Sequence, residues 1–292
     1  MDIEELGYQA IDAFYLIGGA IILIELAEML FKGEHKVKTV SEMLVSVSTQ
    51  IPTFFFETFI LTGAYAIYWI ISYSLPWSIP VTWWSFALIM LLADFLYYWE
   101  HRIAHEVRLL WTQHAVHHSS RDYNIATAIR FGPFEGVWSL IIHIPLALMG
   151  FAPEMIVLSV ILVLAYQTWL HTELIGKLGP LELVLNTPSH HRVHHGCDDK
   201  YLDKNYAGIL IIWDRMFGSF QEEEETPRYG LKRDFESRNP VLVWFSELPG
   251  LWTDLRGAKS FGEAWGYLWQ PPGWEPESGK PQATAEGATA ER

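Results

Sequence analysis

The side chains with the most distinctive chemistry in this sequence are histidines grouped at short, regular spacings. The groups are His101 and His105, then His114, His117 and His118, then His191, His194 and His195, with His171 alone in QTWLHTE. In a helix, positions i, i+3 and i+4 project toward the same side. Each group can therefore direct two or three imidazoles at one point, and such spacing is typical of a metal site.

Nine imidazoles exceed the needs of one metal ion, because a catalytic zinc takes three protein ligands and keeps one position open. Two metal ions with four or five nitrogens each would use all nine. Imidazole suits iron, zinc and copper, and the absence of nearby thiols disfavours structural zinc and iron–sulfur sites. The one cysteine, Cys197, also excludes an intramolecular disulfide. The sequence therefore predicts a two-metal centre built from histidines.

The composition indicates where such a centre would lie. Half of the residues are hydrophobic and only 18% are charged, whereas soluble domains carry about a quarter charged residues. This balance predicts a membrane protein with a sizeable polar part. The formal net charge of −14, without a stripe of Lys and Arg, argues against nucleic acid as a partner.

Several apolar windows could supply the helices that hold the histidines, since a helix of about 20 apolar residues crosses a bilayer. The first three windows are long, and the last two form a shorter pair that either crosses twice or dips part way. We therefore expect an all-α integral membrane bundle of about four to five membrane helices with a cytoplasmic, histidine-rich helical cap. The windows are 11–31, 51–75, 81–99, 134–151 and 154–170.

The basic residues predict the orientation of this bundle, because Lys and Arg in short loops concentrate on the cytoplasmic side. If each window crosses once, all twenty basic residues fall on one side, beginning with KGEHKVK at 32–38. The same side receives 100–133 and everything after 171. Both histidine-rich regions are therefore expected at the cytoplasmic face.

Residues 1–272 are expected to form a single membrane-embedded catalytic domain, with a cytoplasmic cap made of 100–133 and 171–272. The apolar segment 205–220 is too short to cross a membrane, so it is predicted to be a helix or strand packed on the bundle. The tail 273–292 is polar and rich in small residues, Pro and Gly, and is predicted to be disordered.

The order HxxxH, HxxHH and a later HxxHH, at the ends of membrane helices, resembles the fatty acid hydroxylase and sterol desaturase superfamily of membrane di-iron oxygenases. The run LNTPSHHRVHHG, followed by DKNYAGILIIWDRMFGSF, is similar to its alkylglycerol monooxygenase branch. The resemblance covers roughly residues 80–230. It implies that the eight motif histidines bind two iron ions, with His171 as a ninth ligand.

Five further residues are candidates for supporting these ligands, since a metal-bound imidazole usually donates its other N–H to a carboxylate or carbonyl. A carboxylate in an apolar helix is costly unless it is paired, which favours Asp94. Gln167 lies one turn before His171, where some relatives carry another histidine, and His190 is expected to point away from the shared face. The five candidates are Asp94, Gln167, His190, Asn205 and Asp214.

The resemblance implies an O2-dependent enzyme that takes a lipid from the bilayer and hydroxylates it, desaturates it or cleaves it by hydroxylation next to an ether oxygen. Sterols and carotenoids are alternative substrates within the superfamily. Without a GxGxxG motif before a helix or a haem motif, electrons must come from a donor in trans. The resemblance suggests tetrahydrobiopterin or a ferredoxin or cytochrome b5 system. Zinc in a purified sample would indicate replacement of iron during expression.

Three other classes compete with this interpretation. A membrane di-haem protein would carry its histidines on separate helices at mid-membrane depth. A histidine-rich metal-binding or transport protein would need ligands along a pathway in the bilayer, where the windows contain only His143. A zinc hydrolase would need the glutamate of an HExxH motif, which these groups lack.

Overall fold

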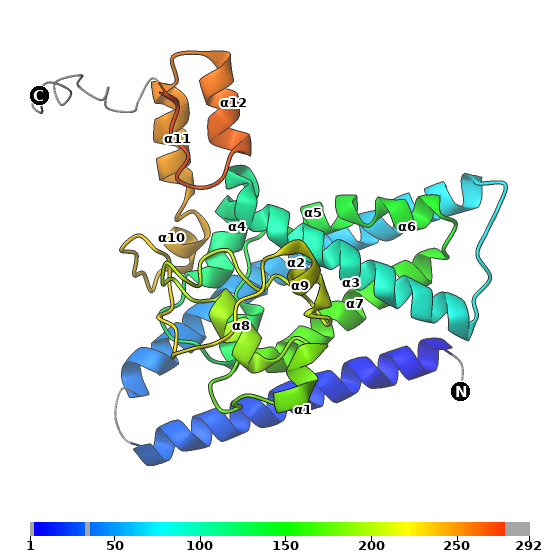
Figure 1. Ribbon diagram of the computed structural model, residues 1–292, viewed down its shortest axis with the longest axis horizontal. Helices are drawn as coiled ribbons and strands as arrows, with labels where there is room; N and C mark the ends of the chain where they lie inside the picture. The colour runs from blue at the N-terminus through cyan, green and yellow to red at the C-terminus, as the bar shows by residue number, and fades with distance from the viewer. Residues whose placement is uncertain (1–2, 33–35, 278–292) are drawn as a thin grey trace, which may run out of the picture.

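The computed structural model describes residues 3–32 and 36–277, and every regular element in these stretches is a helix (Figure 1). The α-helices are α1 (Ile3–Lys32), α2 (Lys36–Ser74), α3 (Trp83–Glu106), α4 (Arg108–His118), α5 (Glu135–Ile142), α6 (Ile144–Leu148), α7 (Pro153–Gln167), α8 (Pro188–His194), α9 (Ile212–Phe217), α10 (Pro240–Trp244), α11 (Leu248–Gly257) and α12 (Phe261–Trp269). The 3-10 helices are η1 (Ile125–Ile129), η2 (Thr168–Leu170) and η3 (Gly179–Leu183). The predicted all-α fold is confirmed.

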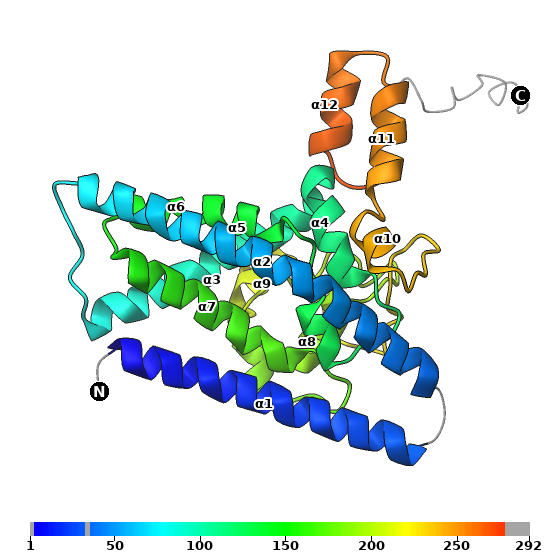
Figure 2. The same ribbon diagram turned by 180° about the vertical axis from the view of Figure 1, so that it is seen from behind.

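Three helical stretches of the described chain are long and apolar enough to cross a membrane. They are Glu5–Glu28 in α1, Thr39–Ser74 in α2, and Pro153–Leu170, which joins α7 to η2. They correspond to the expected windows 11–31, 51–75 and 154–170. The helices α1, α2, α3 and α7 run lengthwise along the molecule (Figures 1 and 2).

The other two expected windows differ from simple membrane helices. The helix α3 has a suitable length, but it carries Asp94 and several charged residues near its end, and it is not among the three candidates. The window 134–151 forms α5 and α6, an apolar stretch from Glu135 to Leu148 that is about 21 Å long at the usual rise per residue. Pro145 lacks an N–H and accounts for the interruption. The described chain thus has three candidate spans, fewer than the four to five expected.

The core of the bundle forms where α3 packs against α7, and α7 also lies against α1. Ile89 and Ala93 of α3 are fully buried with Ile156 and Val163 of α7. A capping box fixes the start of α3, because the N–H of Ser85 donates to Thr82 Oγ1 and the N–H of Thr82 donates to Ser85 Oγ. This packing places the C-terminal end of α3 inside the protein.

The segment 205–220 folds back onto α3 as a loop, a single bridge between Leu185 and Leu210, and the short helix α9. Gly208 permits the close approach, because a Cβ there would lie 2.8 Å from a methyl group of Val163 and 2.9 Å from Asp94 Oδ1. Gly218 ends α9 in the left-handed region with φ of 76°. The tail predicted to be disordered lies, from residue 278 onward, outside the described residues.

Candidate metal centre

The nine histidines reach the interior from four parts of the chain. The last turns of α3 supply two, α4 supplies three, and the short helix α8 with its C-terminal cap supplies three more. His171 follows η2 directly at the end of a candidate membrane span. All nine side chains are buried: His101, His105, His114, His117, His118, His171, His191, His194 and His195.

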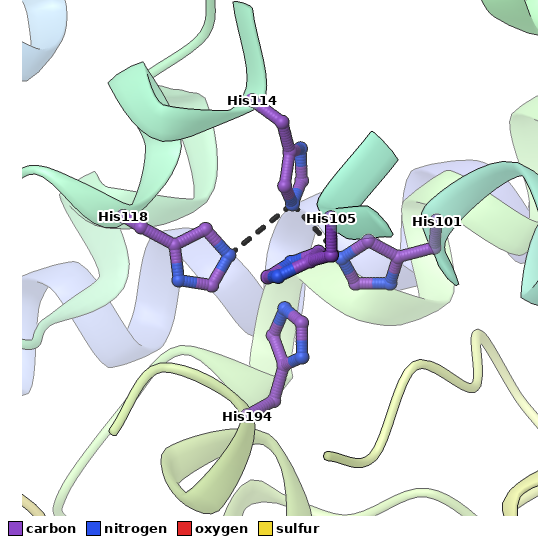
Figure 3. Close-up of side chains that lie close together, drawn as sticks. All are labelled: His101, His105, His114, His118 and His194. Carbon is purple, nitrogen blue, oxygen red and sulfur yellow. Dashed lines mark hydrogen bonds between the residues drawn. The ribbon is translucent and has the colours of Figure 1, made fainter. Parts of the chain in front are cut away.

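These histidines divide into two clusters in which the nitrogens lie within 4.8 Å of one another. The five-histidine cluster contains His101, His105, His114, His118 and His194 (Figure 3). The four-histidine cluster contains His117, His171, His191 and His195. The clusters adjoin, because the rings of His118 and His195 stack with centroids 4.4 Å apart.

One rule of helix geometry explains how the motifs divide. Each residue turns the chain by about 100°, so position i+4 lies about 40° from position i on one side and i+3 about 60° on the other. Accordingly His114 and His118 share one cluster, whereas His117 belongs to the other. In α8, His191 and His195 stay together and His194 joins the opposite cluster. Each HxxHH motif therefore serves both clusters.

Distances between ring nitrogens fit metal ligands. Two nitrogens bonded to one ion at about 2.1 Å and at right angles lie about 3.0 Å apart. The Nε2 atoms of His101 and His114 are 3.0 Å apart, and those of His171 and His191 are also 3.0 Å apart. The Nε2 atoms of His105, His194 and His195 are buried without a hydrogen-bond partner. A cation at each cluster would satisfy these nitrogens.

The opposite ring nitrogens fix the tautomers, because four of them donate to backbone carbonyls. The distances are 2.8 Å from His101 Nδ1 to Tyr206 O, 3.3 Å from His117 to Arg130 O, 3.0 Å from His171 to Gln167 O, and 2.9 Å from His194 to Lys204 O. With Nδ1 protonated, a neutral ring presents the Nε2 lone pair to its cluster. The close Nε2 pairs therefore bring lone pairs together, which a metal ion would stabilise.

Two carboxylates support the five-histidine cluster. Glu135 Oε1 lies 2.5 Å from His114 Nδ1, and Asp203 Oδ1 lies 3.4 Å from His105 Nδ1. Glu135 begins α5, and Asp203 lies in an exposed loop with φ of 57°. A carboxylate partner raises the basicity of a ligating imidazole.

Burial also keeps the imidazoles neutral. It lowers the pKa of His171 to about 4, and burial together with His114 lowers the pKa of His194 to about 3. Burial is also the first cause that places the pKa of six others well below its usual range, namely His101, His105, His117, His118, His191 and His195. These eight rings are thus unprotonated at neutral pH and available as ligands.

Asp94 and Asp214 hold the loop that follows residue 205, and within the described residues neither carboxylate bonds an imidazole directly. Asp94 accepts from the N–H groups of Ile209 and Leu210, at 2.6 and 3.1 Å, and from the indole of Trp213. Asp214 accepts from the N–H groups of Tyr206 and Ala207. The carbonyl of Tyr206 accepts a hydrogen bond from His101 Nδ1. Both carboxylates therefore act on the five-histidine cluster through the backbone of this loop.

Asn205 also positions backbone, whereas the His190 side chain has no direct role in either cluster. The Asn205 amide donates to the carbonyls of His190 and Gln221, and its φ of 55° is one that asparagine adopts more readily than most residues. The His190 ring packs edge-on against Phe220, away from both clusters. Asn205 therefore ties α8 to the loops around it.

Gln167 contributes its main chain to the four-histidine cluster, because its carbonyl accepts from His171 Nδ1. Its side chain faces α3 instead, where Oε1 accepts a hydrogen bond of 2.8 Å from the Tyr97 hydroxyl. The amide group donates to Val163 O. The side chain thus joins α7 to α3.

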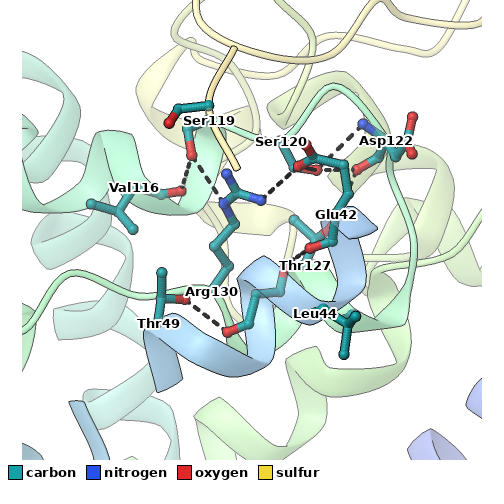
Figure 4. A network of polar contacts seen from close by, with 12 residues as sticks. Glu42, Leu44, Thr49, Val116, Ser119, Ser120, Asp122, Thr127 and Arg130 are labelled. Carbon is teal, nitrogen blue, oxygen red and sulfur yellow. Dashed lines mark hydrogen bonds and ion pairs between the residues drawn. The ribbon is translucent and has the colours of Figure 1, made fainter. Parts of the chain in front are cut away.

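A buried ion pair supports His117 from α2 (Figure 4). Arg130 Nη1 donates to Glu42 Oε2 at 2.9 Å, and Arg130 Nε donates to Ser119 Oγ at 3.0 Å. Arg130 and Glu42 are both buried, and the Arg130 carbonyl accepts from His117 Nδ1. From α1, Glu25 accepts from the Thr172 hydroxyl at 2.7 Å, next to His171. Both N-terminal helices therefore hold the loops of the four-histidine cluster.

The sequence interpretation did not single out Glu25, Glu42, Arg130, Glu135 or Asp203. Glu25 carried a usable signal, because it lies inside an apolar window and an ionisable residue there needs a partner. Glu135 likewise opens the apolar stretch that follows the second motif. Asp203 and Arg130 lie in loops whose course the spacing of residues does not indicate.

An apolar cavity of about 320 Å³ reaches both clusters. The imidazoles of His101 and His114 line it from one cluster, and those of His117 and His171 from the other. Its walls come mainly from α2, α3, α5 and α7, with apolar side chains that include Ile60, Leu61, Val160, Leu164 and Phe134. A long apolar molecule could therefore present one position to both clusters.

The region that carries the clustered histidines is similar to known proteins. Residues 86–219 match the fatty acid hydroxylase family model. Alkylglycerol monooxygenase of Homo sapiens is 42% identical over 270 residues, which are 90% of this chain and 59% of that protein. Alkylglycerol monooxygenase of Danio rerio is 47% identical over 208 residues, 71% of this chain and 45% of that protein. Ornithine lipid hydroxylase OlsE of Rhizobium tropici is 35% identical over 133 residues, 45% of this chain and 40% of that protein.

The chain spans about half the length of the curated relatives it matches. No solved structure matches it. The matched region contains all nine clustered histidines and most of the cavity wall. Residues 86–219 therefore form a fatty acid hydroxylase domain, and over most of its length the chain is similar to alkylglycerol monooxygenases.

Proposed function

We propose that this protein is a membrane-bound di-iron oxygenase that uses O2 to hydroxylate a lipid. One observation carries the proposal: two buried histidine clusters line the same apolar cavity, and that cavity lies among helices long enough to cross a membrane. Neither a metal store nor a structural metal site needs an apolar cavity beside its ligands.

Two iron ions are the proposed occupants, with five imidazoles at one cluster and four at the other. Imidazole ligands suit iron, and no thiolate belongs to either cluster in the described chain. When bound, such a pair of ions supplies the O2 chemistry that amino-acid side chains lack. Each reaction would insert one oxygen atom into a C–H bond and reduce the other to water, using two electrons and two protons.

The protein's own residues would hold and orient the reactants. The neutral imidazoles keep the ions in place, and the carbonyls and carboxylates at Nδ1 fix the ring orientations. Apolar walls exclude water and align a hydrocarbon chain beside His101, His114, His117 and His171. We infer that the lipid enters sideways from the bilayer and that the clusters lie on its cytoplasmic side, where the Lys and Arg residues gather.

We propose an ether lipid as the substrate, because the relatives with the highest identity given above are alkylglycerol monooxygenases. Hydroxylation of the carbon next to the ether oxygen yields a hemiacetal, which separates into an aldehyde and an alcohol. The electrons would come from a separate reductant, either a reduced pterin such as tetrahydrobiopterin or a ferredoxin or cytochrome b5 system.

The test combines metal analysis with substrate conversion. Protein purified with iron is expected to contain about two irons per chain if each cluster takes one ion, and to release a fatty aldehyde from an alkylglycerol under O2 with a reductant. The matched control is the same protein without O2, which should leave the lipid unchanged. Iron-loaded protein that converts no ether lipid, acyl lipid or sterol under any of these reductants would refute the proposal.

A further inference from the structure

The helices α11 and α12 form a hairpin that projects sideways from the body of the protein (Figures 1 and 2). Their axes run across the direction of α1 and α2, and α12 lies on the side of α11 that faces the body of the helical bundle. The hairpin packs against α4, the helix that carries three of the clustered histidines. It plays no part in the proposed chemistry.

The hairpin exposes a row of large aromatic side chains. Phe261, Trp265 and Trp269 follow one another at intervals of four residues, which places them on one face of α12. They are 82%, 54% and 42% exposed, and successive rings lie 6.1 and 5.4 Å apart. We call these three residues the aromatic stripe. A neighbouring face of α12 is covered, since Gly266 lies beneath the ring of Trp274.

The base of the hairpin is fixed to the start of α4. The N–H of Arg108 donates to Gln270 O at 3.1 Å, and its guanidinium donates to Asp254 at 2.5 Å. The same guanidinium lies 5.8 Å from the centre of the Tyr267 ring. The stripe therefore keeps a defined position relative to the candidate membrane spans.

We propose that the aromatic stripe lies in the headgroup region of the bilayer crossed by α1, α2 and α7. A helix that runs across the spans, at the end of the bundle where α3 ends and α4 begins, has the direction of an interfacial helix. Trp and Phe favour this region, because their rings fit between hydrocarbon and water. The inference rests on the membrane crossing of the spans and is independent of the proposed chemistry.

Two basic residues of the hairpin suit a lipid partner, although α12 also carries the acidic Glu263. Asp254 is neutralised by Arg108, while Arg256 and Lys259 are exposed basic residues. Arg256 lies 5.6 Å from the ring of Trp252, which is also exposed. Basic side chains beside exposed indoles favour a negatively charged membrane surface.

The test places a fluorescent label on the stripe of the full chain in lipid vesicles. In a Cys197→Ser background, Phe261→Cys carries the label, and Asp199→Cys, in an exposed loop, is the matched control. The vesicles contain phosphatidylcholine and phosphatidylserine, with a nitroxide lipid that quenches at shallow depth. Iodide in the buffer measures exposure to water. Far-UV circular dichroism shows whether every variant keeps the helical fold.

The label at position 261 is expected to be quenched by the shallow nitroxide and to be several-fold less accessible to iodide than the label at 199. Adding Trp265→Ser and Trp269→Ser should restore iodide quenching at 261. Equal iodide quenching at both positions would overturn the proposal. Shielding from both iodide and the nitroxide lipid would overturn it too, since a second copy or another protein would then cover the stripe.

Discussion

The two histidine clusters differ in what holds their rings. In the five-histidine cluster, His114 and His105 face the carboxylates of Glu135 and Asp203. In the four-histidine cluster, the carbonyls of Arg130 and Gln167 accept from His117 Nδ1 and His171 Nδ1, and His191 Nδ1 is buried without a hydrogen-bond partner. A carboxylate strengthens the imidazole–metal bond more than a neutral carbonyl does. The five-histidine cluster should therefore bind its metal more tightly.

The four-histidine cluster depends instead on the N-terminal helices. Glu42 on α2 holds Arg130, and Glu25 on α1 holds Thr172, so carboxylates act one step away from the ligands. One cluster is thus stabilised by electrostatics at the rings and the other by the packing of candidate membrane helices. Conditions that loosen α1 and α2 should release the metal of the four-histidine cluster first.

The largest expected effect follows from removing one ligand of each cluster. His194→Ala should lose the metal of the five-histidine cluster and His117→Ala that of the other, each retaining its second metal. Oxygenase activity should fall by more than the roughly 10–100-fold typical of losing an outer partner. Iron content and product formation measure both effects. Full activity in either variant would contradict the assignment of that ligand.

Breaking the buried ion pair should affect one cluster selectively. Arg130→Met leaves Glu42 buried without its partner, and such a change costs about 3–5 kcal/mol of unfolding free energy. Thermal unfolding in detergent should show this loss, with iron missing mainly from the four-histidine cluster.

The matched control for that variant is Lys232→Met, which removes the exposed pair with Asp199. An exposed pair contributes about 0–1 kcal/mol, so unfolding and iron content should change little. If Arg130→Met lost iron equally from both clusters, the proposed division of support would be wrong.

The carboxylates of Glu135 and Asp203 allow a direct test of whether the five-histidine cluster binds its metal more tightly. Glu135→Gln should weaken metal binding there by about 10–100-fold, measured by competition with a chelator. Asp203→Asn should do less, because its contact with His105 is 3.4 Å and its side chain is 65% exposed. If Asp203→Asn weakened metal binding more than Glu135→Gln, the greater role given to Glu135 would be wrong. If either variant lost metal only from the four-histidine cluster, these carboxylates would not support the five-histidine cluster.

The smallest expected effect on stability comes from removing the hydrogen bond between the Tyr97 hydroxyl and the Gln167 side chain. Tyr97→Phe removes the hydrogen bond to its side chain and should lower the unfolding free energy by about 1 kcal/mol. Iron content should stay constant, because His171 is held by the Gln167 carbonyl. Iron loss in this variant would show that the side chain supports the cluster as well.

Helical spacing was sufficient to predict that His101 and His105, or His191 and His195, would converge, because contacts between i and i+4 are local. The sequence also indicated three of the candidate spans by length and apolarity. The same spacing places His117 and His118 on different sides of His114, but which histidines each of them meets depends on where α8 and His171 approach α4. The roles of Asp94 and Asp214 were also not predictable, because both act through a loop that returns to α3 from residues 206–210.

Both clusters take histidines from the HxxHH motif of α4 and from that of α8. The number of residues within these two motifs is therefore constrained. One residue inserted between the histidines of either HxxHH motif would rotate the later ligands by about 100° and disturb both clusters together. The segment from Ile175 to Leu185, in contrast, carries no clustered histidine. Length differences among natural relatives should therefore accumulate between the motifs and be absent within them.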